Sequence, residues 1–429
     1  MPYSAILWCS RFASHIDFPI SSCPAAPDGV WTSRDMSEPK THCRLAPPMK
    51  VSYFLHDVGH PDLARRVGML REGGAETTVF GFHRIRPADA DVAASVIDLG
   101  QTVDARLAQR VWAVARALRR LRRWASELAS SNVILARNLE MLFLAAVARR
   151  LYAPRAALVY ECLDIHRLML TNGVVGRALR QLERRLLKRC QGLIVSSPAF
   201  IREYFQRFHP ALPKLFVVEN KVFLSGEVPS KRKTEVPAGP PWRIGWFGLL
   251  RCRRSLEILL DVLRSVPGSV EVIVAGRLTP DVFGDIENDL QHIPGLTFLG
   301  PYRDDATDLS RLFGSVHVAW AIDFYEAGAN SAWLLPNRLY RAALYGAVPV
   351  AMANIETGRW LAAHGAGILL EEPARDSLVA MIRGMTLEKL AGAQAMLERI
   401  PRSALVIEPE ECRALVRALG ELGRGPCGP

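Results

Sequence analysis

The sequence predicts an α/β protein with two Rossmann-like, doubly wound domains that face a cleft. From residue 49 onward, short apolar segments alternate with longer helical ones, which is the pattern of a parallel sheet with crossover helices. The alternation stops at residues 225–241, which are polar and proline-rich like a linker, and then starts again. The chain has 429 residues, 49% of them hydrophobic, which suffices for two cores. A cleft between two such domains is a common place for a ligand.

The segment before residue 49 has a different character. Residues 1–48 are rich in proline and lack hydrophobic periodicity, so we expect a disordered leader. Met49 directly precedes the first predicted strand, and we hypothesise that it is the natural start and that the leader is a gene-model extension. The expected organisation is then an N-terminal domain at 49–225, a linker at 226–241, a C-terminal domain at 242–400 and a tail with a helix at 401–429.

Each domain has its own set of predicted elements. In the N-terminal domain the expected strands are 51–55, 76–81, 94–98, 132–136, 156–161 and 192–196, and the expected helices are 61–72, 104–129, 138–151 and 174–190. In the C-terminal domain the expected strands are 243–247, 270–275, 296–299, 316–320, 348–351 and 367–370, and the expected helices are 254–265, 307–313, 337–345 and 376–386.

Composition excludes several classes of protein. No run of about 18 apolar residues predicts a transmembrane helix, and the first dozen residues do not resemble a secretory signal. The eight cysteines form neither a CxxC pair nor a zinc-type cluster, which favours a reduced, cytosolic protein. Neither GxxxxGK[ST] nor HExxH occurs, which argues against a P-loop NTPase and a zincin.

The net charge of +11 is unevenly distributed. Residues 49–225 hold 28 Lys and Arg against 15 Asp and Glu, whereas residues 242–429 hold 19 against 22. A strongly basic half beside a slightly acidic one excludes a uniformly basic packaging protein and indicates an anionic partner for the first half.

The first strand of the C-terminal domain leads into a basic turn. Gly248 permits a tight turn or close backbone approach, and the helix that follows offers N–H groups and a positive dipole end. Arg251, Arg253 and Arg254 add guanidinium groups that bind phosphate oxygens in pairs. This is the chemistry of a pyrophosphate site; the alternative is a basic surface turn.

Glycine recurs after the next two strands. Gly276 precedes Arg277, and Gly300 lies two residues before Tyr302. Glycines at the carboxyl ends of successive parallel strands let a nucleotide lie against the backbone, although a single glycine there is usually only a turn.

The most distinctive segment is residues 323–341. A polar, glycine-containing loop with Glu326 and Asn330 leads to Pro336 and Asn337 at a predicted helix start. The helix start would direct N–H groups into the cleft; the alternative is that Asn337 is only an N-cap.

These segments together resemble nucleotide-sugar glycosyltransferases of the GT-B fold, and among them the family 4-like enzymes of succinoglycan-type exopolysaccharide assembly. The resemblance covers about residues 49–372 and is carried by residues 51–55, 160–167, 246–255, 298–302, 335–340 and 346–350. It implies an acceptor domain at 49–225, a donor domain at 242–400, and transfer of a sugar from a nucleotide-activated donor, such as UDP-glucose or another UDP-hexose, to a lipid-linked oligosaccharide.

The resemblance also implies roles for individual residues. Arg251 and Arg254 would hold the donor diphosphate, Tyr302 would flank the base, and residues 326–337 would face the sugar and ribose. The complete set of expected donor-binding residues is Gly248, Arg251, Arg254, Gly276, Arg277, Tyr302, Glu326, Asn330, Asn337 and Arg341.

One position departs from the family pattern. Arg341 stands where these enzymes usually have a glutamate that contacts the ribose hydroxyls. The alternative to an active enzyme is therefore a GT-B-shaped protein with impaired or no transferase activity. No DxD-type metal motif occurs, because Asp304 and Asp305 are adjacent and Asp323 is isolated, so we expect metal-independent chemistry with no cofactor beyond the sugar nucleotide.

Two loops of the N-terminal domain hold candidate catalytic residues. His56, Asp57 and His60 follow the first strand, and Glu161, Asp164, His166 and Arg167 follow the fifth. We single out His56, Asp57, Asp164 and His166 as candidates for a general base or for orienting the acceptor hydroxyl. The alternative for each is a hydrogen-bonding role within its loop, and the sequence does not distinguish retaining from inverting transfer.

Two helices hold much of the positive charge. Apolar residues recur every three or four positions in 104–129, which places Arg116, Arg119, Arg120 and Arg123 on the opposite face with Trp112. Helix 174–190 carries six basic residues, among them Arg184 and Arg185, and one acidic residue, Glu183.

These faces are either simply solvated or dock on the anionic inner leaflet of the plasma membrane, where a polyprenyl-diphosphate-linked acceptor would lie. A nucleic-acid-binding α/β protein is a further alternative, but the chain has no aromatic-rich binding motif and no recognition helix, so we expect no nucleic-acid partner.

Overall fold

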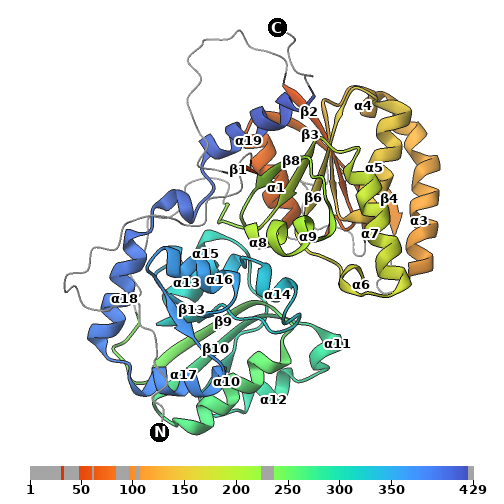
Figure 1. The fold of residues 1–429 in the computed structure, drawn as a ribbon. Coiled ribbons are helices and arrows are strands. Elements are labelled where there is room, and N and C mark those ends of the chain that lie inside the picture. The colour runs from red at the N-terminus through yellow and green to blue at the C-terminus, as the bar shows by residue number, and fades with distance from the viewer. Residues whose placement is uncertain are drawn as a thin grey trace. The chain divides into compact units, whose positions relative to one another are not determined.

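The computed structural model describes residues 30–32, 48–59, 62–83, 96–101, 107–223 and 236–423. They form two compact α/β units, each with one parallel sheet and helices on both of its faces (Figure 1). The C-terminal unit is Asn220–Val406, and the N-terminal unit consists of the described residues of 30–219 and 407–423. The predicted fold class is confirmed.

The sheet of the N-terminal unit has the order β1-β8-β7-β6-β5-β2-β3-β4. Its strands are β1 Val30–Trp31, β2 Met49–Leu55, β3 Ala75–His83, β4 Val96–Gln101, β5 Val133–Arg137, β6 Ala157–Cys162, β7 Gly192–Val195 and β8 Lys214–Val217. From β2 the chain builds outward to β3 and β4, and then returns to add β5 on the other side of β2. The strand order therefore reverses between β2 and β5, and in open α/β sheets ligands bind at such switch points.

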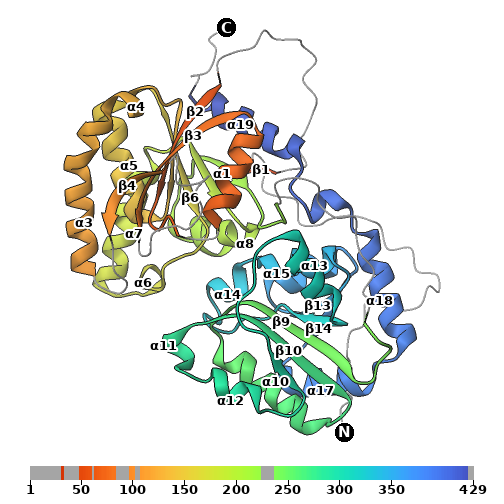
Figure 2. The ribbon, with the colours of Figure 1, turned by 180° about the vertical axis from the view of Figure 1, so that it is seen from behind.

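Two layers of helices cover this sheet (Figures 1 and 2). Helices α1 and α19 pack together on one face, and α3, α5 and α7 pack side by side on the other. The helices are α1 Asp62–Glu72, α3 Leu107–Arg120, α4 Ala125–Ala129, α5 Leu139–Tyr152, α6 Arg167–Leu170, α7 Val174–Leu187, α8 Pro198–Phe200, α9 Gln206–Phe208 and α19 Pro409–Glu421, with a 3₁₀ turn at Leu121–Trp124 and a π-helical turn at Ile201–Phe205.

Three parts of this unit differ from the sequence predictions. Val30 and Trp31 pair in parallel with β8, so the expectation of a disordered leader is wrong for these two residues, whereas residues 1–29 and 33–47 lie outside the described ranges. Strand β8 was not predicted. The predicted C-terminal tail helix exists as α19, but it packs on α1 and so belongs to the N-terminal unit.

The C-terminal sheet has the order β11-β10-β9-β12-β13-β14, with its switch point between β9 and β12. Its strands are β9 Trp242–Leu250, β10 Val270–Leu278, β11 Leu296–Phe298, β12 Val318–Trp320, β13 Val348–Met352 and β14 Ile368–Leu370. Its helices are α10 Arg253–Ser265, α11 Pro280–Phe283, α12 Glu287–Gln291, α13 Ala306–Gly314, α14 Asn330–Trp333, α15 Asn337–Leu344, α16 Glu356–Ala363, α17 Ala374–Arg383 and α18 Leu387–Arg399, with a 3₁₀ turn at Arg402–Ala404. Helices α16 and α18 were not predicted.

The boundary between the units lies slightly before the predicted linker. The Asn220 amide donates to the Leu335 carbonyl at 3.2 Å, and Nζ of Lys221, which is buried, donates to the Ser403 carbonyl at 2.9 Å. These contacts attach residues 220–222 to the C-terminal unit. Of the predicted linker, only residues 236–241 lie among the described residues.

Candidate functional site

Three glycines lie side by side at the carboxyl edge of the C-terminal sheet. Gly276 of β10 is paired in register with Gly248 of β9, and its N–H donates to the Gly300 carbonyl at 2.8 Å. Gly248 and Gly276 have φ angles of 118° and 140°, and a Cβ on Gly276 would come within 1.7 Å of the Gly248 carbonyl oxygen. The predicted close approach of backbones is confirmed. The alternative of a tight turn at Gly248 is wrong, because β9 and β10 stay paired for two residues beyond these glycines.

The guanidinium of Arg251 crosses the switch point of this sheet. Its Nε donates to Oδ2 of Asp323 at 3.0 Å, which links the segment after β9 to the segment after β12. The guanidinium also lies 5.3 Å from the centre of the Tyr325 ring. A cation is thereby held where a doubly wound sheet binds anionic ligands.

The other two arginines of the basic turn point elsewhere. Arg253 donates to the Val282 carbonyl. Arg254 stacks over Phe324 and donates to the Glu372 carboxylate at 2.9 Å, with both partners about half exposed. The expectation of three guanidinium groups at one anion is therefore wrong: Arg251 lies at the switch point, whereas Arg254 forms a solvent-exposed ion pair with Glu372.

Cys252 organises this turn and was missed in the sequence. It is the N-cap of α10, and its buried sulfur accepts N–H bonds from Ser255 at 3.3 Å and Phe324 at 3.2 Å. Cysteine is not a preferred N-cap residue, so the pattern contained no signal for this role.

Arg338, in the first turn of α15, is a second missed residue. Its Nη2 lies 3.5 Å from the Leu249 carbonyl and 4.0 Å from the point where a Cβ on Gly248 would lie. Its Nη1 is buried without a hydrogen-bond partner, and burial lowers the pKa of this guanidinium. A cation with unsatisfied donors beside the glycine edge is chemically suited to bind an anion.

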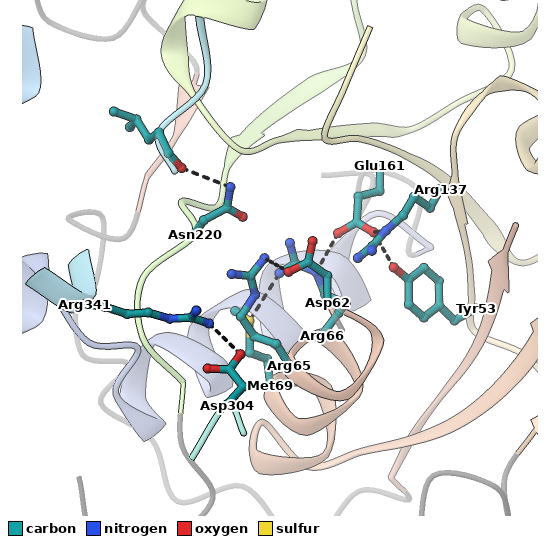
Figure 3. Close-up of polar contacts among 11 residues, drawn as sticks. Tyr53, Asp62, Arg65, Arg66, Met69, Arg137, Glu161, Asn220, Asp304 and Arg341 are labelled. Atoms are coloured by element: carbon teal, nitrogen blue, oxygen red, sulfur yellow. Dashed lines mark hydrogen bonds and ion pairs between the residues drawn. The ribbon is translucent and has the colours of Figure 1, made fainter. Parts of the chain in front are cut away.

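Arg341 forms an ion pair with Asp304 at 2.5 Å (Figure 3). Tyr302 lies beside this pair; burial raises the pKa of its hydroxyl, and the Arg341 charge opposes the rise. Asp305 is the N-cap of α13 and accepts from the Asp308 N–H at 2.9 Å. Within the described ranges, no three His, Cys, Asp or Glu side chains come together as metal ligands would.

The remaining predicted donor residues have varied environments. Asn330 is buried and donates to Oε2 of Glu326 at 2.5 Å, so this amide orders the loop. Asn337 is the first residue of α15 and Pro336 is its cap, so the N-cap alternative for Asn337 is wrong. Arg277 is exposed on β10.

Glu161 anchors the carboxyl edge of the N-terminal sheet (Figure 3). Glu161 lies inside β6, within the predicted strand 156–161, and is completely buried, so its assignment to the loop after that strand is wrong. It accepts from Nε of Arg66 at 2.6 Å, from Nε of Arg137 at 2.8 Å and from the Tyr53 hydroxyl at 2.5 Å. Burial alone would raise the pKa of Glu161, but the charges of Arg137 and Arg66 outweigh it and lower this pKa to about 2.

The four catalytic candidates differ in their contacts. Asp57 accepts from the Gly59 N–H at 3.0 Å, and His166 caps α6 by accepting from the Leu168 N–H at 3.3 Å. Asp57 and His166 thus make the hydrogen bonds within their loops that were predicted as the alternative to a catalytic role. Asp164 is exposed. His56 lies at the switch point between β2 and β5, where its Nδ1 is 3.2 Å from the side-chain nitrogen of Asn138.

The basic helices are largely as predicted. Arg116, Arg119, Arg120, Arg123, Arg184 and Arg185 are exposed. Arg120 also donates to the Leu99 carbonyl at 3.2 Å, Arg184 donates to the Phe208 carbonyl at 2.8 Å, and the side chain of Trp112 lies outside the described residues. No helix in the described part of the chain has the length and apolar character needed to cross a membrane.

The interior of α7 differs from the prediction. Arg180 is buried and donates to two backbone carbonyls, those of Met169 and Thr171. Glu183 is completely buried and accepts from the hydroxyls of Tyr160 and Tyr204 and contacts His209. These two charges therefore do not belong to the solvated basic face.

Comparison with known proteins identifies the family, although no family model matches the chain. The chain is 42% identical to the succinoglycan biosynthesis protein ExoL of Rhizobium meliloti (strain 1021) over 381 residues, which cover 87% of this chain and 94% of that protein. Among solved structures it resembles Anabaena HepE in complex with UDP and glucose, with a TM-score of 0.61, 17% identity and coverage of 86% and 98% of the two chains. It also resembles WaaG, a glycosyltransferase involved in lipopolysaccharide biosynthesis, with a TM-score of 0.57, 14% identity and coverage of 85% and 99%. The chain therefore belongs to the succinoglycan biosynthesis family of ExoL, and its fold is the GT-B fold of these solved structures.

Proposed function

We propose that this protein transfers a hexose from a UDP-activated donor to a lipid-linked oligosaccharide during exopolysaccharide assembly. The observation that supports it best is the glycine edge of the C-terminal sheet, with Arg251 at the switch point and Arg338 beside Gly248. Bare backbone lets a nucleotide approach closely, and guanidinium groups bind its diphosphate. The ExoL relationship supports the pathway.

The leaving diphosphate gains negative charge as the glycosidic bond forms. In this proposal Arg251, Arg338 and the amino-terminal turn of α10 stabilise that charge without a metal ion. Asp304 already pairs with Arg341, and Asp305 caps α13, so neither carboxylate is placed as a metal ligand, which supports a metal-independent reaction.

We propose that the N-terminal unit binds the acceptor at an anionic membrane surface on the cytoplasmic side. Helices α3 and α7 lie on the same face of its sheet, on either side of α5. Besides the exposed arginines, solvent-exposed apolar residues occur here: Val174 and Val175 at the start of α7 are 74% and 56% exposed. Basic and apolar side chains together suit docking on an anionic lipid surface.

Release of UDP tests the function. The full-length protein is incubated with a panel of UDP-, GDP- and dTDP-sugars and a polyprenyl-diphosphate-linked oligosaccharide, with and without EDTA. Acceptor-dependent release of UDP that persists in EDTA is the expected result. Release only from another nucleotide sugar would overturn the UDP assignment, and loss of activity in EDTA would overturn metal independence.

The second candidate is a GT-B-shaped protein that binds nucleotide without transferring sugar. The observation that favours it is Arg341, whose guanidinium is held by Asp304 where the family resemblance implies a carboxylate. UDP binding without release of product from any donor would support this second function.

A further inference from the structure

Asn138 has an unusual backbone conformation. It lies directly after β5 with φ 70° and ψ 161°, and among the residues that the structure describes it is the only one other than glycine with a positive φ. This region is populated almost only by glycine, because a Cβ is strained there. When a residue other than glycine is found in such a conformation, its side chain is expected to make an interaction that glycine could not make.

The surrounding structure holds this strained residue from both sides. The Asn138 N–H donates to the Glu161 carbonyl at 3.2 Å, and the Asn138 carbonyl accepts from the Leu142 N–H at 2.9 Å in the first turn of α5. Glu161 is itself held by Arg66 and by Arg137, the residue before Asn138. The backbone of Asn138 is thus fixed between β6 and α5.

The side chain of Asn138 is directed at His56. Its Nδ2 lies 3.2 Å from Nδ1 of the imidazole, across the switch point between β2 and β5. An amide nitrogen can only donate, so Nδ1 is the acceptor, and a neutral ring then carries its proton on Nε2. The contact therefore determines both the orientation of the ring and its tautomer.

We propose that Asn138 is a positioning residue that holds His56 in the Nε2–H form, and that Nε2–H donates a hydrogen bond to an oxygen of the acceptor saccharide. This rests on the proposed function and deepens it: of the two roles considered for His56, it assigns orientation of the acceptor and not proton abstraction. Doubly wound sheets bind ligands at the switch point, where this ring lies.

Four variants of the full-length protein separate these roles. Asn138→Gly removes the contact and the strain together. Asn138→Asp offers only acceptor atoms to Nδ1 and so favours the opposite tautomer or the imidazolium. In His56→Gln the amide nitrogen reaches the place of Nε2, whereas in His56→Asn it reaches only that of Nδ1.

The assay is transfer to the polyprenyl-diphosphate-linked oligosaccharide from whichever UDP-sugar the release experiment identifies as the donor. We expect Asn138→Gly to keep or raise Tm while kcat/KM for the acceptor falls about tenfold. We expect Asn138→Asp and His56→Asn to lose at least as much, and His56→Gln to stay within about tenfold of wild type. Long-range ¹H–¹⁵N NMR of the wild type should show the Nε2–H tautomer of His56, and Asn138→Gly should show a mixture.

Three results would overturn the proposal: full activity in Asn138→Gly, increased activity in Asn138→Asp, which a general base would give, or inactivity of His56→Gln equal to that of His56→Asn. If the wild-type protein transfers no sugar, the proposed function fails, and NMR alone then decides the positioning role. An unchanged tautomer in Asn138→Gly would refute that role, and a changed one would support it.

Discussion

Arg251 and Asp323 are 72 positions apart in the sequence, and their ion pair links the segments after β9 and β12, the two strands between which the strand order of the C-terminal sheet reverses. The N-terminal sheet has a corresponding contact between His56 and Asn138. In both units a side-chain contact thus spans the place where the fold leaves room for a ligand.

Replacement of an arginine of the basic turn should weaken UDP binding. If each guanidinium holds a phosphate through a charged hydrogen bond, Arg251→Ala or Arg254→Ala should each lose about 1.5–3 kcal/mol of binding free energy by calorimetry. Arg264→Ala, at an exposed position of α10, is the control and should bind normally. An unchanged Kd for either variant would remove that residue from the diphosphate site.

Arg338 is expected to lower the stability of the folded protein and to strengthen UDP binding. Its Nη1 is a buried donor without a partner, a situation that costs about 1–3 kcal/mol. Arg338→Met should therefore leave Tm unchanged or raise it, while the increase in Tm produced by saturating UDP becomes smaller. Thermal denaturation with and without UDP measures both effects, and an undiminished UDP effect would contradict this role.

The glycine edge should not accept a side chain. In Gly276→Ala the new Cβ would meet the Gly248 carbonyl oxygen, whereas Gly284, also at positive φ, has no atom within 4 Å of an added Cβ. Both substitutions strain the backbone, so the collision should make Gly276→Ala less stable than Gly284→Ala by about 1–3 kcal/mol. Urea unfolding of the two variants gives this difference, and equal stability would show that the strands can separate at no cost.

The buried carboxylate of Glu161 should make stability depend on acidic pH. Its pKa falls from an ordinary value near 4.5 to about 2 in the folded protein, so its contribution is complete above pH 4.5 and is lost as the pH falls toward 2. Glu161→Gln removes the carboxylate that pairs with two buried arginines and should lower the free energy of unfolding by about 3–5 kcal/mol.

The control for this experiment is Glu76→Gln, because Glu76 forms an exposed pair with Lys50 and should contribute less than about 1 kcal/mol. Denaturant titrations between pH 3 and 7 should show a smaller pH dependence for Glu161→Gln than for wild type. The same pH dependence in Glu161→Gln and in wild type would mean that another carboxyl group is responsible.

The basic face formed by α3 and the 3₁₀ turn after it, Leu121–Trp124, should contribute to membrane binding. Substitution of Arg116, Arg119 and Arg123 by Gln should lower the affinity for vesicles with anionic lipid by about 1 kcal/mol per residue. The matched control replaces three exposed arginines of the C-terminal unit, Arg264, Arg303 and Arg311. Flotation measures binding, and equal binding of wild type to neutral vesicles would refute the electrostatic docking.

Hydrophobic periodicity predicted most strands and helices because it is a local property of the chain. Among the elements that it missed are β1, β8, α16, α18 and several helices of five residues or fewer. It assigned α19 to a tail because sequence patterns do not show which unit a helix packs against. Around the site, Gly248 and Gly276 lie at the carboxyl edge of the sheet as predicted, but inside β9 and β10 and not after them. The burial of Glu161 was not predicted, because its ion pairs with Arg66 and Arg137 join residues that are distant in the sequence.

By itself, the sequence determined the fold class, the family resemblance and the places of Gly248, Gly276 and Arg251 near the carboxyl edge of the C-terminal sheet, since all of these depend on spacing along the chain. Only the tertiary structure decided which side chains meet. Strand order and register bring His56 to Asn138 across 82 positions, turn Arg253 away from Arg251, and leave Arg338 beside Gly248. Such contacts arise because parallel strands that are distant in sequence share one carboxyl edge, and no local pattern records which strands become neighbours.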